Sequence, residues 1–124
     1  MVICFSSCTK KAEKLIVGKW KVTSARSADI DAVEEDKGAT WNFKENGTFS
    51  GTLMGIDIEC DYVCDDNTLE LSGGDLKDDD FRIVLTYDID EISKKEMSLS
   101  GKIKYTEVGY GSDSYSLSYE LEKK

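Results

Sequence analysis

The stretch FRIVLTYDID, from Phe81 to Asp90, alternates apolar and polar side chains with a period of two. Every second residue is apolar, whereas arginine, threonine and aspartate dominate the positions between them. Such alternation is typical of a β-strand that lies with one face on a core and the other in water. The stretch therefore predicts an antiparallel sheet, and the same period continues outward along the chain.

Seven further segments show this period, which gives eight strands joined mostly by short links. Their apolar positions are Trp20 and Val22; Trp41 and Phe43; Phe49 and Leu53; Ile56 to Cys64; Leu69 and Leu71; Phe81 to Ile89; Met97 to Tyr105; and Tyr115 to Leu121. Eight hairpin-linked strands with one apolar face each predict an all-β, eight-stranded antiparallel up-and-down barrel. The acidic segment Ala25 to Gly38 interrupts this order, and we expect it to hold a short helix or a lid between strands 1 and 2.

The composition excludes several classes of function. The chain has 124 residues, enough for one domain with its own core, which we expect to span residues 15–124. Its net charge of −9 disfavours nucleic acid and anionic membrane surfaces as partners, because both attract basic patches. Histidine is absent, which removes the commonest general base and the commonest transition-metal ligand.

The first residues resemble the end of a bacterial lipoprotein signal. Val2 to Phe5 is a short apolar run, and Ser6-Ser7-Cys8 places small residues before a cysteine, as in a lipobox. The resemblance implies that Cys8 is the first mature residue and carries acyl chains. The protein would then be anchored in the cell envelope, on the periplasmic or surface side of the outer membrane. Because a secretory apolar region needs about 7–15 residues, residues 1–8 are expected to be a truncated signal remnant and residues 9–14 a linker. The alternative is a frayed, mildly apolar terminus.

A second resemblance lies in the barrel itself. Gly18-Lys19-Trp20 resembles the Gly-x-Trp signature that opens the first strand of lipocalins. The Trp41 to Phe49 hairpin is similar to the second hairpin of short bacterial lipocalin-like domains. This resemblance implies that Gly18 and Trp20 close one end of the barrel and that the other end opens to a ligand. Two lipocalin features do not match: no Thr-Asp-Tyr occurs near Asp90, and no arginine on the last strand covers Trp20.

If Trp20 marks the closed end, the antiparallel order assigns every connection to one end of the barrel. The hairpins at Asn46, Asp66 and Asp90 then fall at the closed end. The connections at residues 25–38, 54–55, 73–80 and 109–113 form the open rim. The two longest connections belong to the rim, as expected if they frame an entrance.

Most aromatic side chains share the inward face of the predicted barrel. These are Trp20, Trp41, Phe43, Phe49, Tyr62, Phe81, Tyr87, Tyr105, Tyr115 and Tyr119. Two interpretations stay open: the rings fill the core, or they line an apolar pocket in which tyrosine hydroxyls orient a ligand. For a pocket, the candidate ligand-binding residues are Met54, Tyr62, Phe81, Tyr87, Tyr105 and Tyr115.

The chain offers no constellation that supports catalysis, so we do not expect an enzyme. Strand carboxylates such as Asp57, Glu59 and Asp88 fall on the outward face, where burial cannot raise their pKa for acid–base chemistry. The acidic loop from Asp75 to Asp80 lacks the spacing of an EF-hand. The serines near Gly109 have no histidine to activate them. Neither a metal nor a cofactor is expected.

Cys60 and Cys64 share one face of a predicted strand. In an extended strand their Cα atoms would lie about 13 Å apart, at ~3.3 Å per residue. A disulfide needs Cα atoms within about 7 Å, so it would require a turn or bulge between the two residues. Two buried thiols are therefore favoured over a disulfide.

Two functions follow from these observations. The first is a lipid-anchored, lipocalin-like binding protein of the envelope that holds a small, mainly apolar ligand in the barrel. The second is a protein-interaction module with a filled barrel, which acts on another envelope protein as an inhibitor or assembly subunit. A cavity of about 300 Å³ or more would favour the first, and a filled core with an exposed apolar patch would favour the second.

Overall fold

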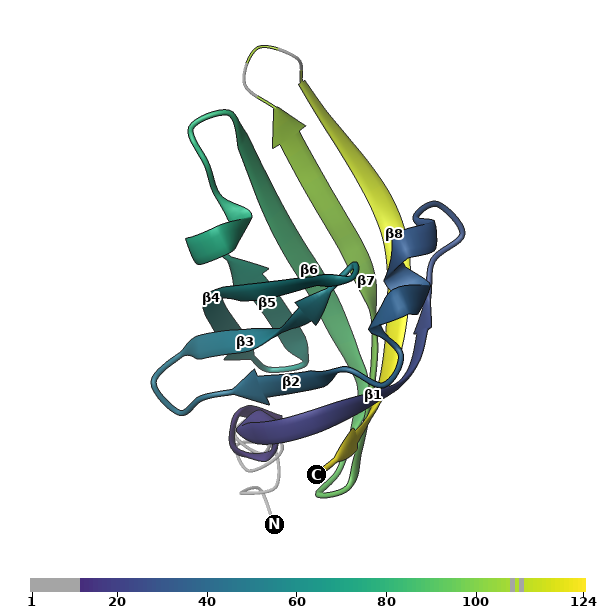
Figure 1. The fold of residues 1–124 in the computed structure, drawn as a ribbon. Coiled ribbons are helices and arrows are strands. Elements are labelled where there is room, and N and C mark those ends of the chain that lie inside the picture. Colours follow the sequence, from purple (N-terminus) through teal and green to yellow (C-terminus); the bar gives the residue numbers. More distant parts are fainter. Residues whose placement is uncertain (1–11, 108, 110) are drawn as a thin grey trace.

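The computed structural model describes residues 12–107, 109 and 111–124, so Cys8 and the predicted signal remnant lie outside the described residues. The strands are β1 (Gly18–Arg26), β2 (Thr40–Phe43), β3 (Thr48–Leu53), β4 (Ile56–Asp65), β5 (Thr68–Ser72), β6 (Phe81–Ile92), β7 (Glu96–Glu107) and β8 (Gly111–Lys123). Two short 3₁₀-helices, η1 (Asp31–Asp36) and η2 (Gly74–Leu76), follow β1 and β5 (Figure 1). Residues 12–16 form a helical turn before β1.

The strands form one closed barrel. Each strand pairs antiparallel with the next along the chain, and β8 returns to pair with β1, where Lys123 lies opposite Trp20. The prediction of an eight-stranded antiparallel up-and-down barrel, with a short helical segment between strands 1 and 2, is confirmed. Closure gives every described strand a partner on both sides over part of its length, although the first residues of β6 and of β8 extend beyond their shorter neighbours β5 and β1.

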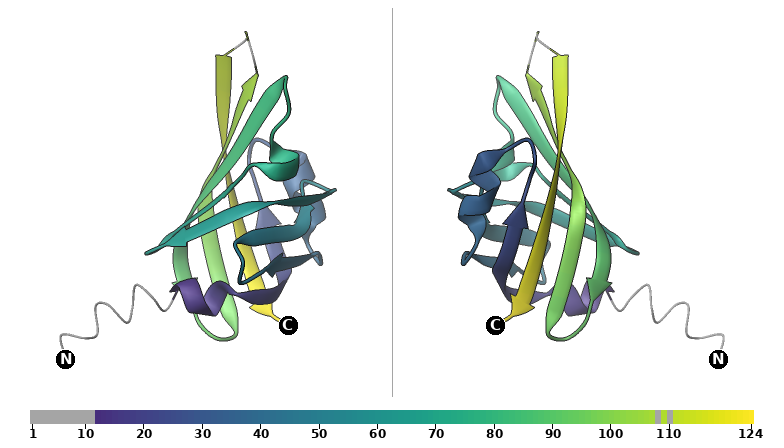
Figure 2. Two further views of the ribbon diagram at one scale, coloured as in Figure 1. Left: turned by 90° about the vertical axis from the view of Figure 1, so that its left-hand side faces the viewer. Right: turned by 90° about the vertical axis from the view of Figure 1, so that its right-hand side faces the viewer.

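The alternating pattern of the strands produces the core. Successive side chains of a strand point to opposite faces, so the apolar rows of the sequence all enter the barrel. Strands β6, β7 and β8 have 12, 12 and 13 residues, whereas β2, β3 and β5 have 4, 6 and 5. The three long strands therefore project beyond the short ones at one end, as Figures 1 and 2 show. The projecting part carries further inward-facing side chains.

The register of the strand pairs places the connections at the predicted ends. At the start of β1, Gly18 lies opposite Phe43, so the β2–β3 turn is at the same end as Trp20. The β4–β5 and β6–β7 turns lie at this end too, and the projecting β7–β8 hairpin lies at the other. One boundary differs from the prediction. β6 continues to Ile92, past the expected turn at Asp90, because a bulge between Ile89 and Glu91 absorbs the change in register.

Trp20 lies in the closed end with none of its surface exposed. Its Nε1 donates a hydrogen bond to the carbonyl of Ile16, 2.8 Å away, in the helical turn. The Nζ of Lys123 lies 4.5 Å from the centre of the Trp20 ring and donates to the carbonyls of Leu15 and Val17. The ammonium group of Lys123 on the last strand therefore covers Trp20, in the place where an arginine was sought in the sequence.

The packed part of the chain begins before Leu15, where the barrel domain was expected to start. Ala12 and Ile16 of the helical turn are both buried, so part of the stretch predicted as a linker rests on the closed end. Among the described residues, no helix has the length and apolar character needed to cross a membrane.

Cys60 and Cys64 are free thiols in a continuous β4, as the extended-strand argument predicted. Burial raises the pKa of the Cys60 thiol to about 12 and that of Cys64 to about 11. Neighbouring carboxylates, Asp61 for the first and Glu13 for the second, add to both shifts. Since the thiolate is the reactive form, both cysteines are poor nucleophiles.

Candidate functional site

Aromatic rings fill the middle of the barrel. The Trp41 ring centre lies 4.6 Å from that of Tyr119 and 5.4 Å from that of Phe49, and Tyr87 lies 6.0 Å from Tyr119. Trp41, Phe49 and Tyr87 are completely buried, and Tyr119 nearly so. Gly51 provides the space for this packing, because a Cβ there would lie 2.7 Å from Cδ1 of Trp41. Of the two interpretations of the aromatic set, the structure therefore shows the filled core at this level of the barrel.

Helix η1 closes the barrel at the end opposite Trp20. It lies in the long connection between β1 and β2, and its Val33 and Asp36 are buried. A 3₁₀-helix has three residues per turn, so positions 33 and 36 share the face that enters the barrel. The connection at residues 25–38 thus covers the open rim rather than simply bordering it.

Asp36 is a fully buried carboxylate. Its oxygens accept hydrogen bonds from the backbone N–H groups of Met54 (2.8 Å) and Gly55 (3.0 Å) and from the hydroxyl of Tyr119 (2.7 Å). Burial raises the pKa of Asp36 above its ordinary value even though these three hydrogen bonds act to lower it. Met54 has a φ of 53°, in the left-handed region that residues other than glycine rarely adopt. The two hydrogen bonds to Asp36 stabilise this conformation of the β3–β4 turn.

A second buried tyrosine, Tyr87, lies next to Tyr119 in the core. Tyr87 is completely buried, and its hydroxyl has no hydrogen-bond partner among the described residues. Burial raises its pKa well above the ordinary value, and the charge of Asp36 adds to that shift. The hydroxyl is therefore protonated and able to donate. An unpartnered buried hydroxyl costs about 1–3 kcal/mol, which makes this position unusual in a filled core.

The projecting ends of β6, β7 and β8 carry a group of partly buried apolar side chains, which we call the rim face. It consists of Phe81, Ile83, Tyr105 and Tyr115. Phe81 and Tyr105 stack with their ring centres 6.0 Å apart and their planes inclined by 17°. Ile83 lies opposite Tyr105 in the sheet, and Ile83 and Tyr115 both pack against the core. The rim face is the apolar surface that the sequence pattern directs inward but the short strands do not cover.

The structure separates the six predicted ligand-binding residues into different places. Phe81, Tyr105 and Tyr115 lie on the rim face, and Met54 lies in the turn that Asp36 holds. Tyr87 is sealed in the core. Tyr62 lies on β4 toward the closed end, where its hydroxyl donates to the carbonyl of Lys44 (2.6 Å). Four of the six thus gather at the open end, and the set as a whole does not line one cavity.

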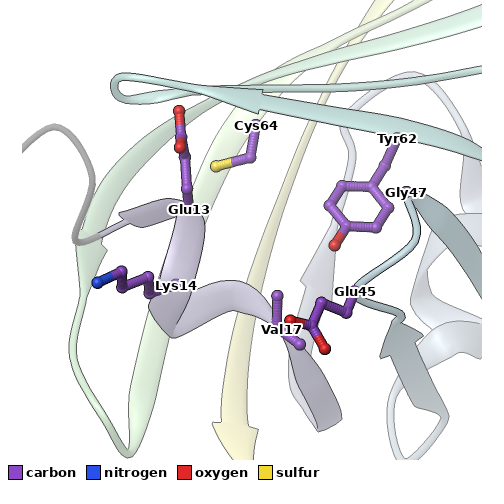
Figure 3. A pocket seen from close by; sticks show the side chains of 7 residues that line it. All are labelled: Glu13, Lys14, Val17, Glu45, Gly47, Tyr62 and Cys64. Carbon is purple, nitrogen blue, oxygen red and sulfur yellow. The ribbon is translucent and has the colours of Figure 1, made fainter.

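Tyr62 instead borders a groove of about 610 Å³ on the outside of the closed end (Figure 3). Its lining residues are Glu13, Lys14, Val17, Glu45, Gly47, Tyr62 and Cys64. The groove is walled by the helical turn, the β2–β3 hairpin and the end of β4. Its lining combines apolar side chains with charged side chains of both signs. The thiol of Cys64 is protonated, because its pKa is raised. This arrangement offers no set of groups for catalysis.

Comparison with known proteins identifies the fold. Residues 16–102, well over half of the chain, match the family described as lipocalin-like domain. The chain belongs to the lipocalin-like domain family. No curated protein matches it. The solved structure of EF1p2_mFAP2b bound to DFHBI aligns with a TM-score of 0.56 over 94% of this chain and 99% of that chain, at 17% identity. At this identity the likeness shows the fold alone.

Two residues with central contacts in this lipocalin-like domain, Asp36 and Lys123, were missed in the sequence. Asp36 was not singled out within the acidic segment that was expected to hold a short helix or a lid, whereas the strand acids Asp57, Glu59 and Asp88 are exposed as predicted. The spacing of Val33 and Asp36 was the available signal, since three residues separate them on a helix with three residues per turn. Lys123 was missed because only an arginine was sought. Among the described residues, no group of three or more side chains suitable for a metal ion occurs.

Proposed function

We propose that this lipocalin-like domain is a non-catalytic binding protein that holds a small, mainly apolar ligand against the rim face. The stacked pair of Phe81 and Tyr105 carries the proposal, because two rings lie partly exposed at the open end while the middle of the barrel is filled. Aromatic rings present large apolar area with little conformational freedom to lose on binding. The tyrosine hydroxyls beside them supply hydrogen bonds for orientation.

The structural neighbour suggests a first probe. EF1p2_mFAP2b shares the fold and binds DFHBI, so we propose that a small molecule of this kind is a reasonable test ligand for this chain. ANS, which becomes fluorescent on apolar surfaces, is the second probe. Saturable binding of either probe would support a ligand site, and an unsaturable signal would indicate only nonspecific contact.

Tyr105→Ala tests the location of the site. The change removes one ring of the stacked pair, and we expect affinity for a bound probe to fall about tenfold, as for the loss of an aromatic anchor. Val63→Ala is the matched control, because Val63 is 62% exposed on β4 and lies outside the rim face. Equal affinities of the two variants would place the site elsewhere.

A second candidate function rests on the filled interior. If the rim face takes up an apolar segment of another envelope protein, the domain is an interaction module, an inhibitor or an assembly subunit. Native mass spectrometry of protein purified from its own membrane separates the two candidates. A co-purified small molecule supports the ligand site, whereas a stoichiometric protein partner whose binding Tyr105→Ala weakens supports the interaction module.

We further propose that Cys8 anchors the domain in the cell envelope, on the periplasmic or surface side of the outer membrane. Support comes from the small residues before Cys8 and from the position of the packed chain. Ala12 lies at the closed end, four residues after Cys8, so an anchor there would reach at most about 14 Å from it. The rim face would then point away from the membrane.

The anchor is tested by expressing the gene with its full signal and comparing wild type with Cys8→Ala. We expect wild type in the membrane fraction and the variant in the soluble fraction, because stable anchoring requires more than one acyl chain. Equal partitioning of both proteins would contradict the anchor while leaving the ligand site intact.

A further inference from the structure

The first residues of β8 have a neighbouring strand on one side only. β8 pairs with β7 from Gly111 onward, but its pairing with β1 begins at Ser118, because β1 ends at Arg26. The β7–β8 hairpin therefore projects past the rest of the barrel with an open side, as Figures 1 and 2 show. We call residues 111–115 on this open side the β8 edge; its side chains are exposed apart from the half-buried Tyr115.

Ser116 shows which backbone groups of β8 point to the open side. Its N–H donates to the carboxylate of Asp29 (3.3 Å), and its carbonyl accepts from the hydroxyl of Ser27 (2.6 Å). Side chains of the β1–η1 connection thus pair the two groups that a neighbouring strand would otherwise pair. Successive residues of a paired strand direct their N–H and C=O groups to alternate sides. The backbone groups of Ser112 and Ser114 therefore point to the open side too, where the pairing with β1 does not reach them.

The outer face beside the β8 edge carries positive charge. Lys104 and Lys102 of β7 lie opposite Ser114 and Ser116. Farther from the edge, Arg82 of β6 lies opposite Thr106 of β7, and Lys77 pairs with Arg82. The four cations are all exposed, and we name them the basic patch: Lys77, Arg82, Lys102 and Lys104. The patch has the opposite sign to the chain as a whole, whose net charge is −9.

We propose that the β8 edge is a docking site for an extended segment of a partner protein in which acidic residues alternate with apolar ones. The segment adds a strand to the open side of β8, and its backbone pairs with Ser112 and Ser114. Its apolar side chains continue the rim face beside Tyr115, and its acidic side chains lie on the face of the basic patch. The proposal extends the second candidate function, on which it rests, and does not require a small molecule at the rim face.

The spacing of a β-sheet brings the acidic side chains within reach of the lysines. An added strand lies about 4.8 Å from β8 and so about 10 Å from β7. The side chains between them are those of Ser112, Ser114 and Ser116, which are short and leave the lysines uncovered. An extended lysine and an extended glutamate together cover the remaining distance. Complementary charge then selects an acidic segment and fixes its register.

The same edge is poorly suited to a second copy of this chain. Only one antiparallel register pairs all of residues 111–115 with their own copy, and it places Asp113 opposite Asp113. Like charges directly opposite each other destabilise a strand pair. That arrangement would also place the basic patches of the two copies on one face. The charges therefore favour a different protein as the partner.

The experiment measures binding of a fluorescent peptide of alternating glutamate and valine to the 124-residue chain by anisotropy. The account predicts saturable binding, and weaker binding of the matched peptide of alternating lysine and valine. In the proposed register, the N–H groups of the glutamates face β8 and those of the valines face solvent. N-methylation of the glutamates should therefore lower affinity about tenfold or more, whereas N-methylation of the valines should change it little.

Two protein variants test the charge. Lys102→Glu with Lys104→Glu should lower affinity for the glutamate peptide about tenfold. Lys19→Glu with Lys21→Glu is the matched control, because both lysines are exposed on β1 toward the closed end and the change in net charge is the same. Screening by salt confines such effects to about 10 Å at 0.1 M, so the control should bind as wild type does.

Ser114→Pro tests the backbone, because it removes an N–H that no strand of the barrel uses. It should weaken the glutamate peptide about tenfold, and circular dichroism establishes that it is folded. If it is not, the two N-methylated peptides test the same contact on the unaltered chain.

Absence of saturable binding would overturn the proposal, as would equal binding of the glutamate and lysine peptides or equal effects of the two N-methylations. Peptide binding that Tyr105→Ala weakens and that N-methylation does not affect would overturn strand addition but leave the interaction module standing. Loss of the interaction module would be shown separately, by the absence of any protein partner in native mass spectrometry.

Discussion

At the scale of single residues, Asp36 determines how the open end is closed. Its carboxylate is completely buried, and it joins η1 to the β3–β4 turn and to β8 through three hydrogen bonds. Tyr87 and Tyr119 lie side by side in the same core, but only Tyr119 has a partner for its hydroxyl. The two tyrosines therefore form a matched pair for mutation.

Tyr119→Phe and Tyr87→Phe remove the same atom from neighbouring buried rings. Tyr119→Phe should lower the free energy of unfolding by about 1–3 kcal/mol, because it leaves a buried carboxylate short of one donor. Tyr87→Phe should leave stability unchanged or raise it, since the lost hydroxyl had no partner. Urea denaturation of both variants checks the prediction, and equal destabilisation would mean that Tyr87 has a partner in solution.

The raised pKa of Asp36 predicts a pH dependence with a definite sign. Because the folded state raises this pKa above its ordinary value of 3.8, the folded protein binds the proton more tightly than the unfolded chain. The contribution of Asp36 to stability is therefore greatest below the ordinary pKa and declines as the pH rises through the raised value. Urea melts at several pH values between about 3 and 7 test this.

Asp36→Asn provides the reference for these melts, because it removes the titration and leaves the other carboxylates unchanged. The free energy of unfolding of wild type, minus that of Asp36→Asn, should decrease as the pH rises. A difference that stays constant or increases with pH would show that hydrogen bonds outweigh burial at Asp36.

At the scale of elements, the strands and a short helix between β1 and β2 could be predicted from the sequence, whereas the contacts of η1 could not. In a barrel the two faces of each strand meet different surroundings, so a period of two persists through β6, β7 and β8. Within residues 25–38 that period stops. The partners of Asp36 come from distant segments, with Tyr119 lying 83 positions along the chain. Nothing local in the sequence shows that these donors will surround the carboxylate, so Asp36 was not singled out as a buried acid.

The closed end offers a second test at this scale. The Nζ of Lys123 links β8 to the helical turn through the carbonyls of Leu15 and Val17 and covers Trp20. Lys123→Met keeps the apolar stem and removes the ammonium, which should cost about 1–2 kcal/mol in the free energy of unfolding.

Lys124→Met is the control for this substitution, because the Nζ of Lys124 makes one exposed hydrogen bond, to Thr40 Oγ1. It should change stability by less than about 0.5 kcal/mol. Hydrogen exchange of residues 12–16 should accelerate in Lys123→Met alone. Equal behaviour of the two variants would show that Lys123 contributes no more than an ordinary surface lysine.

At the scale of the whole molecule, the order of strands followed from alternation and the turns, and the polarity of the barrel followed from the lipocalin resemblance, which places Trp20 at the closed end. The state of the interior did not follow. The alternation along each strand shows that Phe49 and Tyr87 point inward. Whether a pocket remains depends on how much of the barrel interior the rings from all strands fill together. The candidate site was therefore half predictable: Phe81, Tyr105 and Tyr115 lie together at the open end, whereas Tyr62 lies toward the closed end.

The central claim is that the rim face on β6, β7 and β8 is where this domain binds a small apolar molecule. Mapping the backbone amide signals by NMR during a titration with ANS tests it most directly. The account predicts saturable shifts concentrated around Phe81, Tyr105 and Tyr115, with the turns at Asn46 and Asp66 unaffected. Shifts confined to those two turns, or no saturable shift at all, would contradict it.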